Sequence, residues 1–169
     1  MALKKVSWTD AGLNALEFFS KQMPLLAAGD RSSCNAMTIS WGSLGTLWNR
    51  PVCTVYVRPQ RYTFNLLEKQ EGFSVCVMGE GYYQQLQYCG SKSGRDTDKL
   101  KDCGFTVTYG AMDTPVIQQA QLVLVCRKLY TQDLDPLQML DQSIRDAVYP
   151  QGGFHRCYTG QVEEVYIKE

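Results

Sequence analysis

Two arginines, a tyrosine and a threonine follow one another closely at Arg58, Arg61, Tyr62 and Thr63. They stand where a predicted strand ends and a predicted helix begins, and the free N–H groups and dipole of a helix start favour an anion. Two guanidinium groups beside two hydroxyls suit the oxygens of a phosphate better than those of a carboxylate. A solvent-exposed strand end is the alternative interpretation of the same residues.

A second polar stretch, SKSGRDTDK, occupies residues 91–99. A serine-glycine turn that opens a helix offers backbone donors to phosphate, and Arg95 adds positive charge. The alternative is an ordinary exposed loop. The stretch lacks the G-x-x-x-x-G-K-S/T spacing of a nucleoside-triphosphate loop, and no G-x-G-x-x-G follows any predicted strand. The candidate residues here are Ser91, Ser93, Gly94, Arg95 and Lys99.

A third stretch, NAMTISWG at residues 35–42, combines hydrogen-bonding side chains with an indole. Strand alternation would place Asn35, Met37, Ile39 and Trp41 on one face and Ala36, Thr38 and Ser40 on the other. Core packing is one interpretation of such a run. The other is a ligand wall, because Gly42 allows close backbone approach and an indole beside backbone amides can bound a flat heteroaromatic ring.

The elements expected to position these residues are mostly strands. Composition and bounding Gly, Pro and Asn residues predict strands over 36–41, 52–57, 73–78, 105–109, 121–131 and 155–167. Helices are predicted from Thr9 or Asp10 to Lys21, and over 60–70, 81–87 and 96–102. In the strand over 121–131, Val123 and Val125 should face opposite to Leu122 and Leu124. This spacing does not suit repeating βαβ units, so we expect a single mainly-β barrel with short helical insertions.

The composition narrows the possible partners and sites. Seventeen Lys and Arg balance seventeen Asp and Glu, which gives no overall reason to expect a nucleic-acid or membrane partner. No window approaches the roughly 20 apolar residues of a membrane span. Seven cysteines without any C-x-x-C pair predict reduced thiols, mostly in the core, and a cytoplasmic location. Those spacings and a lone histidine, His155, argue against a metal site.

Four ordered blocks resemble a known family. They read N-x-M-T-x-S-W-G, P-V-x-x-V-x-V-R-P-x-R-Y-T, S-x-S-G-R-D-x-D-K and Y-P-x-G-x-x-H-R-x-Y-x-G. From about Pro24 to the C-terminus, the chain is similar to the flavin reductase-like family of FMN-binding split barrels, which includes the flavoredoxins. The resemblance implies one split β-barrel domain over residues 1–169 and a homodimer, with FMN in a cleft near the subunit interface.

The resemblance also assigns the candidate residues to parts of FMN. Asn35, Met37, Thr38, Ile39, Ser40 and Trp41 would hold the isoalloxazine ring. Arg58, Tyr62 and Thr63, with Arg61 nearby, would meet the ribityl phosphate. Ser91, Ser93, Gly94, Arg95 and Lys99 would complete the phosphate end.

The substrate side departs from the family pattern. Relatives often carry acidic residues where Gly153 and Gln161 stand in this chain. His155 would lie near the exposed flavin face and contact a nicotinamide or a partner; the alternative is a strand-end histidine hydrogen-bonded to the loop.

The resemblance implies an FMN-dependent oxidoreductase that takes electrons from NADH or NADPH and passes them to flavin or another acceptor. The alternative is a non-enzymatic electron carrier that partner proteins reduce and oxidise. A barrel that binds haem or another planar ligand is a third hypothesis, and the phosphate-like set of Arg58, Tyr62, Thr63 and Arg95 argues against it.

Overall fold

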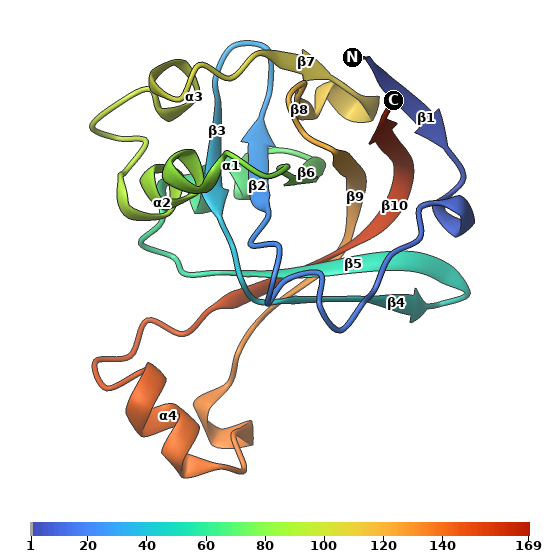
Figure 1. Ribbon diagram of the computed structural model, residues 1–169. Helices are drawn as coiled ribbons and strands as arrows, with labels where there is room; N and C mark the ends of the chain where they lie inside the picture. The colour runs from blue at the N-terminus through green and yellow to red at the C-terminus, as the bar shows by residue number, and fades with distance from the viewer. Residues whose placement is uncertain (1) are drawn as a thin grey trace.

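Ten antiparallel strands form the body of the protein in the computed structural model, which describes residues 2–169. Eight of them make one strongly curved sheet in the order β3-β2-β6-β9-β10-β5-β4, with β1 paired to β10 (Figure 1). The remaining two, β7 and β8, pair with each other. The strands are β1 Leu3–Val6, β2 Leu25–Gly29, β3 Cys34–Thr38, β4 Gly42–Leu47, β5 Arg50–Val57, β6 Gly72–Val77, β7 Val107–Tyr109, β8 Pro115–Ile117, β9 Leu122–Asp133 and β10 Arg156–Lys168.

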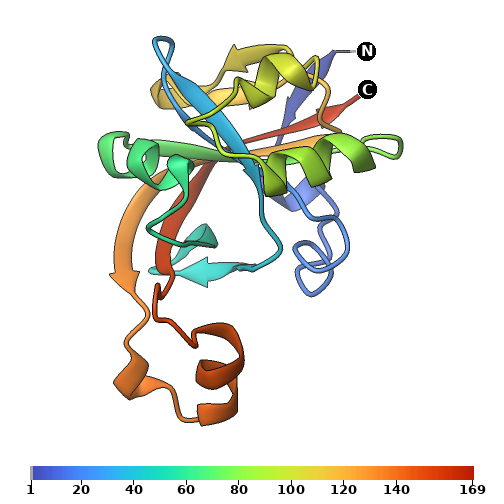
Figure 2. The same ribbon diagram turned by 90° about the vertical axis from the view of Figure 1, so that its left-hand side faces the viewer.

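The helices are short and lie outside the sheet. Helices α1, α2 and α3 lie beside the barrel, whereas α4 belongs to a projection that leaves the barrel after β9 and returns at β10 (Figures 1 and 2). The predicted mainly-β split barrel with helical insertions is therefore confirmed. The helices are α1 Tyr62–Lys69, α2 Tyr83–Ser91, α3 Lys99–Asp102 and α4 Gln142–Val148, with 3-10 turns η1 Trp8–Asp10, η2 Ala111–Asp113 and η3 Pro136–Gln138.

The first half of strand β9, from Leu122 to Cys126, is buried on both faces, which explains its unbroken apolar run. Leu122 and Leu124 belong to the cluster inside the barrel. Val123 and Val125 belong to a second cluster, together with residues of α2, α3 and β8. The predicted alternation in this strand is confirmed. The two clusters together hold the short helices against the sheet by burying apolar surface on each side of it.

Strand β10 runs through the middle of the sheet and pairs with β1, β5 and β9. Its register against β9 shifts after Thr159 and again after Val162, as expected for β-bulges in a strongly bent strand. Gly160 sits at the first shift. A Cβ atom there would lie 2.8 Å from both Cys126 and Phe73, so only glycine fits this contact.

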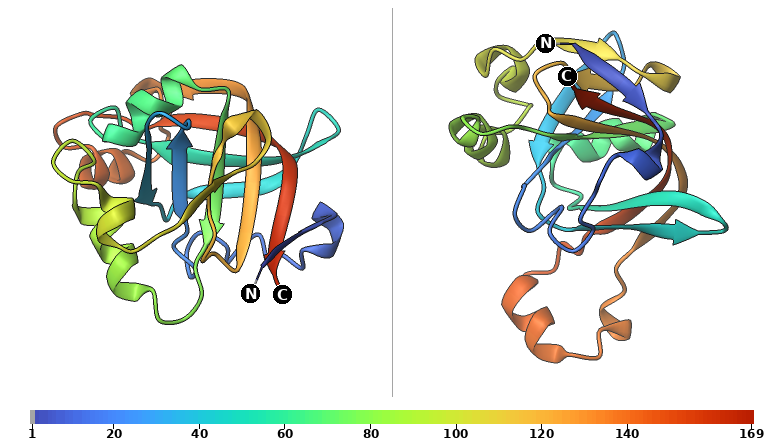
Figure 3. Two further views of the ribbon diagram at one scale, coloured as in Figure 1. Left: turned by 90° about the horizontal axis from the view of Figure 1, so that it is seen from above. Right: turned by 45° about the vertical axis from the view of Figure 1, so that its right-hand side comes forward.

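The barrel is open along one seam. Strands β3 and β4 are consecutive in the chain but stand at the two ends of the sheet order, and the segment from Ile39 to Trp41 connects them (Figure 3). The prediction of a strand over 36–41 is thus right as far as Thr38 and wrong beyond it. Residues predicted to face a flat ligand lie at the point where the barrel does not close.

The predicted helix from Thr9 or Asp10 to Lys21 is wrong. This segment has the 3-10 turn η1, Gly12 at φ +61°, and then a series of turns that buries Phe18 and Phe19. A left-handed residue breaks a helix, and tertiary burial of two aromatic side chains overrides local propensity.

The strands β1, β2, β4 and β8 and the helix α4 are absent from the sequence prediction. Among residues 2–169, every helix is too short or too polar to cross a bilayer.

Candidate functional site

The three candidate stretches meet beside the first turn of α1. The side-chain amide of Asn35 in β3 donates a 2.8 Å hydrogen bond to Oγ1 of Thr63. Gly94, in the loop between α2 and α3, packs closely on Asn35 and Tyr62: a Cβ there would lie 2.5 Å from Tyr62 and 2.6 Å from Oδ1 of Asn35. The structure therefore brings together residues 35, 62, 63 and 94, which belong to three separate parts of the sequence.

Three cations of these stretches are bonded to neutral carbonyl groups. Arg61 donates to the carbonyl of Gly90 at 2.8 Å, and Lys99 donates to that of Cys89 at 3.0 Å. Arg95 donates to the carbonyl of Gln60 at 2.9 Å and lies 5.7 Å from the centre of the Tyr62 ring. Throughout residues 2–169, the ion pairs involve other basic residues and none of these three.

Burial makes the charge on two of these cations unfavourable. The side chain of Lys99 is only 2% exposed, and burial lowers its pKa to about 8. Burial also lowers the pKa of Arg61, and the repulsion between these two cations adds to the effect at Lys99. Buried charges without a counter-charge are costly, so this corner of the protein is suited to an anion that neutralises them.

A cavity of about 500 Å³ lies between the loop before β3 and the loop before α3. Polar side chains and backbone dominate its wall, which includes Ser33, Asn35, Tyr62, Gly94 and Arg95. Of the residues predicted for the phosphate, Tyr62, Gly94 and Arg95 line this cavity, whereas Arg61, Thr63 and Lys99 lie behind its wall. Tyr62 lines a polar cavity, so the alternative of a simple solvent-exposed strand end does not describe it.

A second group of predicted residues lies at the projection. The ring centres of Trp41 and His155 are 4.9 Å apart, and the hydroxyl of Tyr149 lies 2.7 Å from Nδ1 of His155. Arg58 donates to the carbonyl of Val148 at 2.8 Å and lies 5.2 Å from the centre of the Tyr149 ring. Arg58 is thus engaged with the projection, although the sequence places it only three residues from Arg61.

Burial and the charge of Arg58 together lower the pKa of His155 to about 4, so the imidazole is neutral at physiological pH. The expected alternative for this residue, a histidine bonded to its own loop, describes its Nδ1 contact. Its packing on Trp41 also places the ring beside the seam of the barrel. Tyr149 was not among the predicted site residues, although it is the first residue of the Y-P-x-G-x-x-H block.

An apolar cavity of about 530 Å³ adjoins this second group. Ser40, Trp41, Tyr56, Val148 and Tyr149 are among its lining residues. The Trp41 side chain is 46% exposed, and so it is not a core residue. An aromatic wall beside a partly exposed backbone segment is the kind of surface on which a flat ring packs.

Some predicted residues turn away from these cavities. The side chains of Met37 and Ile39 are buried in the barrel core. The backbone of Met37 pairs with Leu26 of β2, and the N–H of Ile39 donates to the carbonyl of Pro24 at 2.9 Å. Thr38 donates to the carbonyl of Leu86. The Ser91 hydroxyl donates back to the carbonyl of Gln87 in its own helix. The remaining predicted residue, Ser93, accepts the backbone N–H of Arg95 through its hydroxyl at 3.2 Å, which shapes the turn around Gly94.

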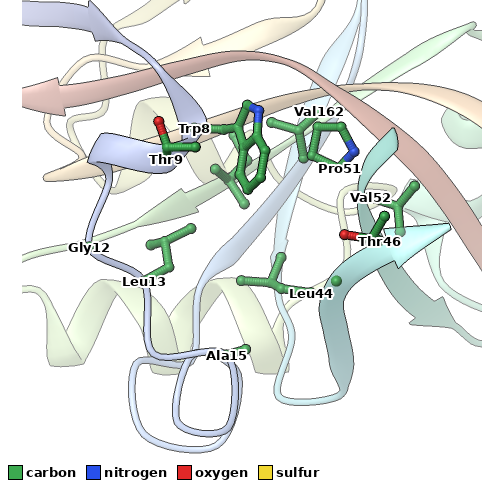
Figure 4. A pocket seen from close by; sticks show the side chains of 12 residues that line it. Trp8, Thr9, Gly12, Leu13, Ala15, Leu44, Thr46, Pro51, Val52 and Val162 are labelled. Carbon is green, nitrogen blue, oxygen red and sulfur yellow. The ribbon is translucent and has the colours of Figure 1, made fainter. Parts of the chain in front are cut away.

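A further cavity, of about 460 Å³, opens between the N-terminal segment and the β4–β5 hairpin (Figure 4). Trp8, Leu13, Leu44 and Val162 face it. Its described lining is largely apolar and includes none of the predicted site residues. It therefore lies apart from both groups described above.

Solved structures with the same fold carry flavin-related names. Flavoredoxin from Methanosarcina acetivorans superposes with a TM-score of 0.71 at 24% identity, covering 98% of this chain and 76% of that chain. Flavoredoxin of Desulfovibrio vulgaris (Miyazaki F) superposes with a TM-score of 0.69 at 18% identity, covering 98% of this chain and 78% of that chain. An FMN-binding protein from Thermus thermophilus superposes with a TM-score of 0.69 at 20% identity, covering 98% of this chain and 83% of that chain. At these identities the likeness concerns the fold.

The sequence matches a protein-family profile and no curated protein. The profile of one family, described as the flavin reductase like domain, matches residues 16–169, which is nearly the whole chain and includes all four of the blocks quoted above. The chain belongs to the flavin reductase-like domain family.

Proposed function

We propose that this protein binds FMN and acts as an oxidoreductase that takes electrons from NADH or NADPH and passes them to flavin or another acceptor. Arg61, Arg95 and Lys99 would hold the phosphate, together with Tyr62 and Thr63. The backbone from Asn35 to Trp41 would run beside the ring system, with the Trp41 indole at its edge.

The unpaired cations carry this proposal. Lys99 is buried and Arg61 is half-buried; the two lie near enough to repel each other and donate only to backbone carbonyls in the described part of the chain. A phosphate dianion would accept several charge-assisted hydrogen bonds there and offset the free-energy cost of burying the positive charges. The closely packed Gly94 supports the same conclusion, because a side chain at that position would fill the space beside Asn35 and Tyr62.

Bound FMN would supply the redox chemistry, by accepting a hydride and releasing electrons. The chain's own contribution would be to orient and shield. Trp41 and His155 would border the ring at the seam, and a neutral His155 would present Nε2 to a nicotinamide or to an acceptor without adding a charge. Arg58 would hold the projection that carries Tyr149 and His155 in place through its bond to Val148.

Anaerobic mixing of the FMN-loaded protein with NADH or NADPH tests the enzymatic role. Rapid bleaching of the bound flavin by either nucleotide is expected. Tight FMN binding without bleaching by either one would instead identify an electron carrier. Binding of riboflavin as tightly as FMN would overturn the assignment of the phosphate.

The homodimer is part of the same proposal. Leu137 and Leu140 on the projection are 85% and 97% exposed, and Ile144 of α4 is also exposed. Large apolar side chains gathered on a segment that stands away from the barrel (Figure 2) are typical of a surface that another chain covers. We propose that a second copy packs on the projection. Sedimentation of the wild type as a dimer and of Leu140→Glu as a monomer is expected; a wild-type monomer with full FMN affinity would contradict it.

A further inference from the structure

Two cysteine side chains touch beside the loop that leads from α2 to α3. Cys89 lies in the last turn of α2, and Cys103 directly follows α3. Their Sγ atoms are 3.8 Å apart. The segment between them contains Gly94, Arg95 and Lys99, so a bond between the two sulfurs would enclose the whole loop.

The surroundings leave room for the two sulfurs to bond. A disulfide needs its sulfurs at about 2.0 Å, so these two would have to move closer by roughly 1.8 Å, which small side-chain rotations can supply. The residue after Cys103 is Gly104, at φ +67°, and no atom lies within 4 Å of the position of a Cβ there. The N–H groups of Cys103 and Gly104 donate to the carbonyls of Lys99 and Lys101, so the approach of the two sulfurs depends on rotation of their side chains.

The two thiols differ in their access to solvent. Cys103 is partly exposed, whereas Cys89 is buried behind it. A small reagent can therefore reach Cys103 first and find Cys89 in contact with it. Burial raises the pKa of both thiols, that of Cys89 to about 12, so little thiolate forms at neutral pH and we expect exchange with an oxidant to be slow and faster at higher pH.

A second cysteine pair in the barrel provides a comparison. Cys53 and Cys126 are neighbours, and the interaction with Cys53 contributes to a raised pKa of Cys126. Both side chains are fully buried in the barrel core. A reagent in solution cannot reach either of them while the barrel is folded, so proximity alone does not make a reactive pair.

We propose that Cys89 and Cys103 are a site of reversible disulfide formation, with a small-molecule disulfide such as oxidised glutathione as the oxidant. The Cys103 thiol loses its proton, attacks one sulfur of the oxidant, and releases one molecule of the small thiol. The Cys89 thiol then loses its proton and attacks Sγ of Cys103, releasing the second. Two protein thiols are oxidised by two electrons, and one disulfide is reduced to two thiols.

The bridge would restrain the loop of residues 90–102, which contains Arg95 and Lys99. Cross-linking stabilises mainly by limiting the open conformations of the enclosed segment. We expect slower proteolysis of this loop in the oxidised protein. Any effect on FMN rests on the proposed function, whereas formation of the bridge does not.

Mass spectrometry of the purified chain tests the proposal without flavin. The protein is incubated with oxidised glutathione, denatured, alkylated and digested. We expect the thiol count to fall by two from the seven of the reduced chain, with one linked peptide pair that contains Cys89 and Cys103. Dithiothreitol should restore all of the thiols.

Three variants make the test specific. Cys89→Ala should stop at the first step and retain glutathione on Cys103, and Cys103→Ser should give no linked peptide. Cys34→Ser, which removes another partly exposed thiol, should form the bridge as the wild type does. A wild-type protein that keeps all its thiols, retains glutathione on Cys103, or links Cys53 to Cys126 would overturn the proposal.

Discussion

The hydroxyl of Tyr149 lies 2.7 Å from Nδ1 of His155, and the same imidazole packs on Trp41 at a ring-centre distance of 4.9 Å. The two contacts fix the ring from different sides. They join the projection between β9 and β10 to the seam between β3 and β4. With Nδ1 engaged, Nε2 is the nitrogen that remains for a ligand.

We expect the imidazole of His155 to titrate near pH 4, because burial and the nearby Arg58 both disfavour its protonated form. NMR measures this directly, since His155 is the one histidine of the sequence and its ring protons need no further assignment. Arg58→Gln should raise the pKa by removing the positive charge. A midpoint near the ordinary value of 6.5 in the wild type would contradict the structure.

The same shift predicts a pH effect on stability. The unfolded chain takes up a proton at its single histidine near pH 6.5, whereas the folded chain does so only near pH 4. The free energy of unfolding should therefore fall, by this contribution, as the pH decreases from about 6.5 to about 4. Comparing the wild type with His155→Gln isolates it, and the difference in slope should correspond to a fraction of one proton.

Arg61→Gln should weaken FMN binding by about 1.5–3 kcal/mol, the scale of a hydrogen bond to a charged group. Riboflavin binding should hardly change, because riboflavin has no phosphate. Arg50→Gln is a matched control, since Arg50 is exposed on β5 and bonds Gln161 rather than any part of the site. Calorimetric titration with both ligands makes the comparison. Equal losses for FMN and riboflavin would place the phosphate elsewhere.

Lys99→Met should change stability and affinity in opposite directions. Without ligand, the variant should be more stable by about 1 kcal/mol, because an apolar side chain replaces a buried cation with a lowered pKa. FMN affinity should fall if Lys99 holds the phosphate as proposed, since one positive charge is lost. Chemical denaturation measures the first effect, and fluorescence titration with FMN measures the second.

The pKa of Lys99 also gives this stability effect a pH dependence. The folded protein releases the Lys99 proton near pH 8 and the unfolded chain near pH 10.5, so the wild type should gain stability as the pH rises between these values. Lys99→Met should lose this part of the slope. If Lys99→Met is less stable than the wild type at pH 7, the surroundings of Lys99 compensate its positive charge and the expectation is wrong.

Trp41→Phe should fold with nearly normal stability, because the side chain is about half exposed and Phe keeps much of its apolar volume. It should nevertheless change the absorption spectrum of bound FMN or slow its reduction. Trp8→Phe is the control, since Trp8 faces the separate apolar cavity of Figure 4. If Trp41→Phe leaves the flavin spectrum and the reduction rate as they are, Trp41 does not border the ring.

Strands β5, β6, β9 and β10 were predictable from the sequence, whereas β1, β2, β4 and β8 were not. Strands β5, β6 and β9 carry β-branched and apolar runs, β10 carries aromatic and β-branched residues among polar ones, and all four match the expected strands within a few residues. Strand β4 carries two glycines and forms through its pairing with β5, which local propensity does not reveal. The segment after Asp10 looked helical because its apolar residues have helical spacing, whereas burial of Phe18 and Phe19 decides its path.

Motif order pointed to three stretches that lie close together in the structure, but it did not reveal the contacts of the projection. Asn35, Tyr62 and Gly94 come together, although the resemblance assigned Asn35 to the ring and the other two to the phosphate end. The contact of Arg58 with Val148 depends on a projection whose helix α4 was not predicted, so spacing alone grouped Arg58 with Arg61. Tyr149 was missed for the same reason, because the fold of the projection brings it into contact with His155.

The open seam should produce a gradient of amide hydrogen exchange around the barrel. Strand β10 has hydrogen-bonded neighbours on both sides, so its amides should exchange slowest. The N–H of Ile39 donates to Pro24, whereas Ser40, Trp41 and the free edge of β4 have no strand across the gap in the described chain, so we expect the amides of these last to exchange fastest. A ligand that binds across the seam would contact both strand edges and slow the exchange of their amides, at a distance from the polar cavity beside Tyr62.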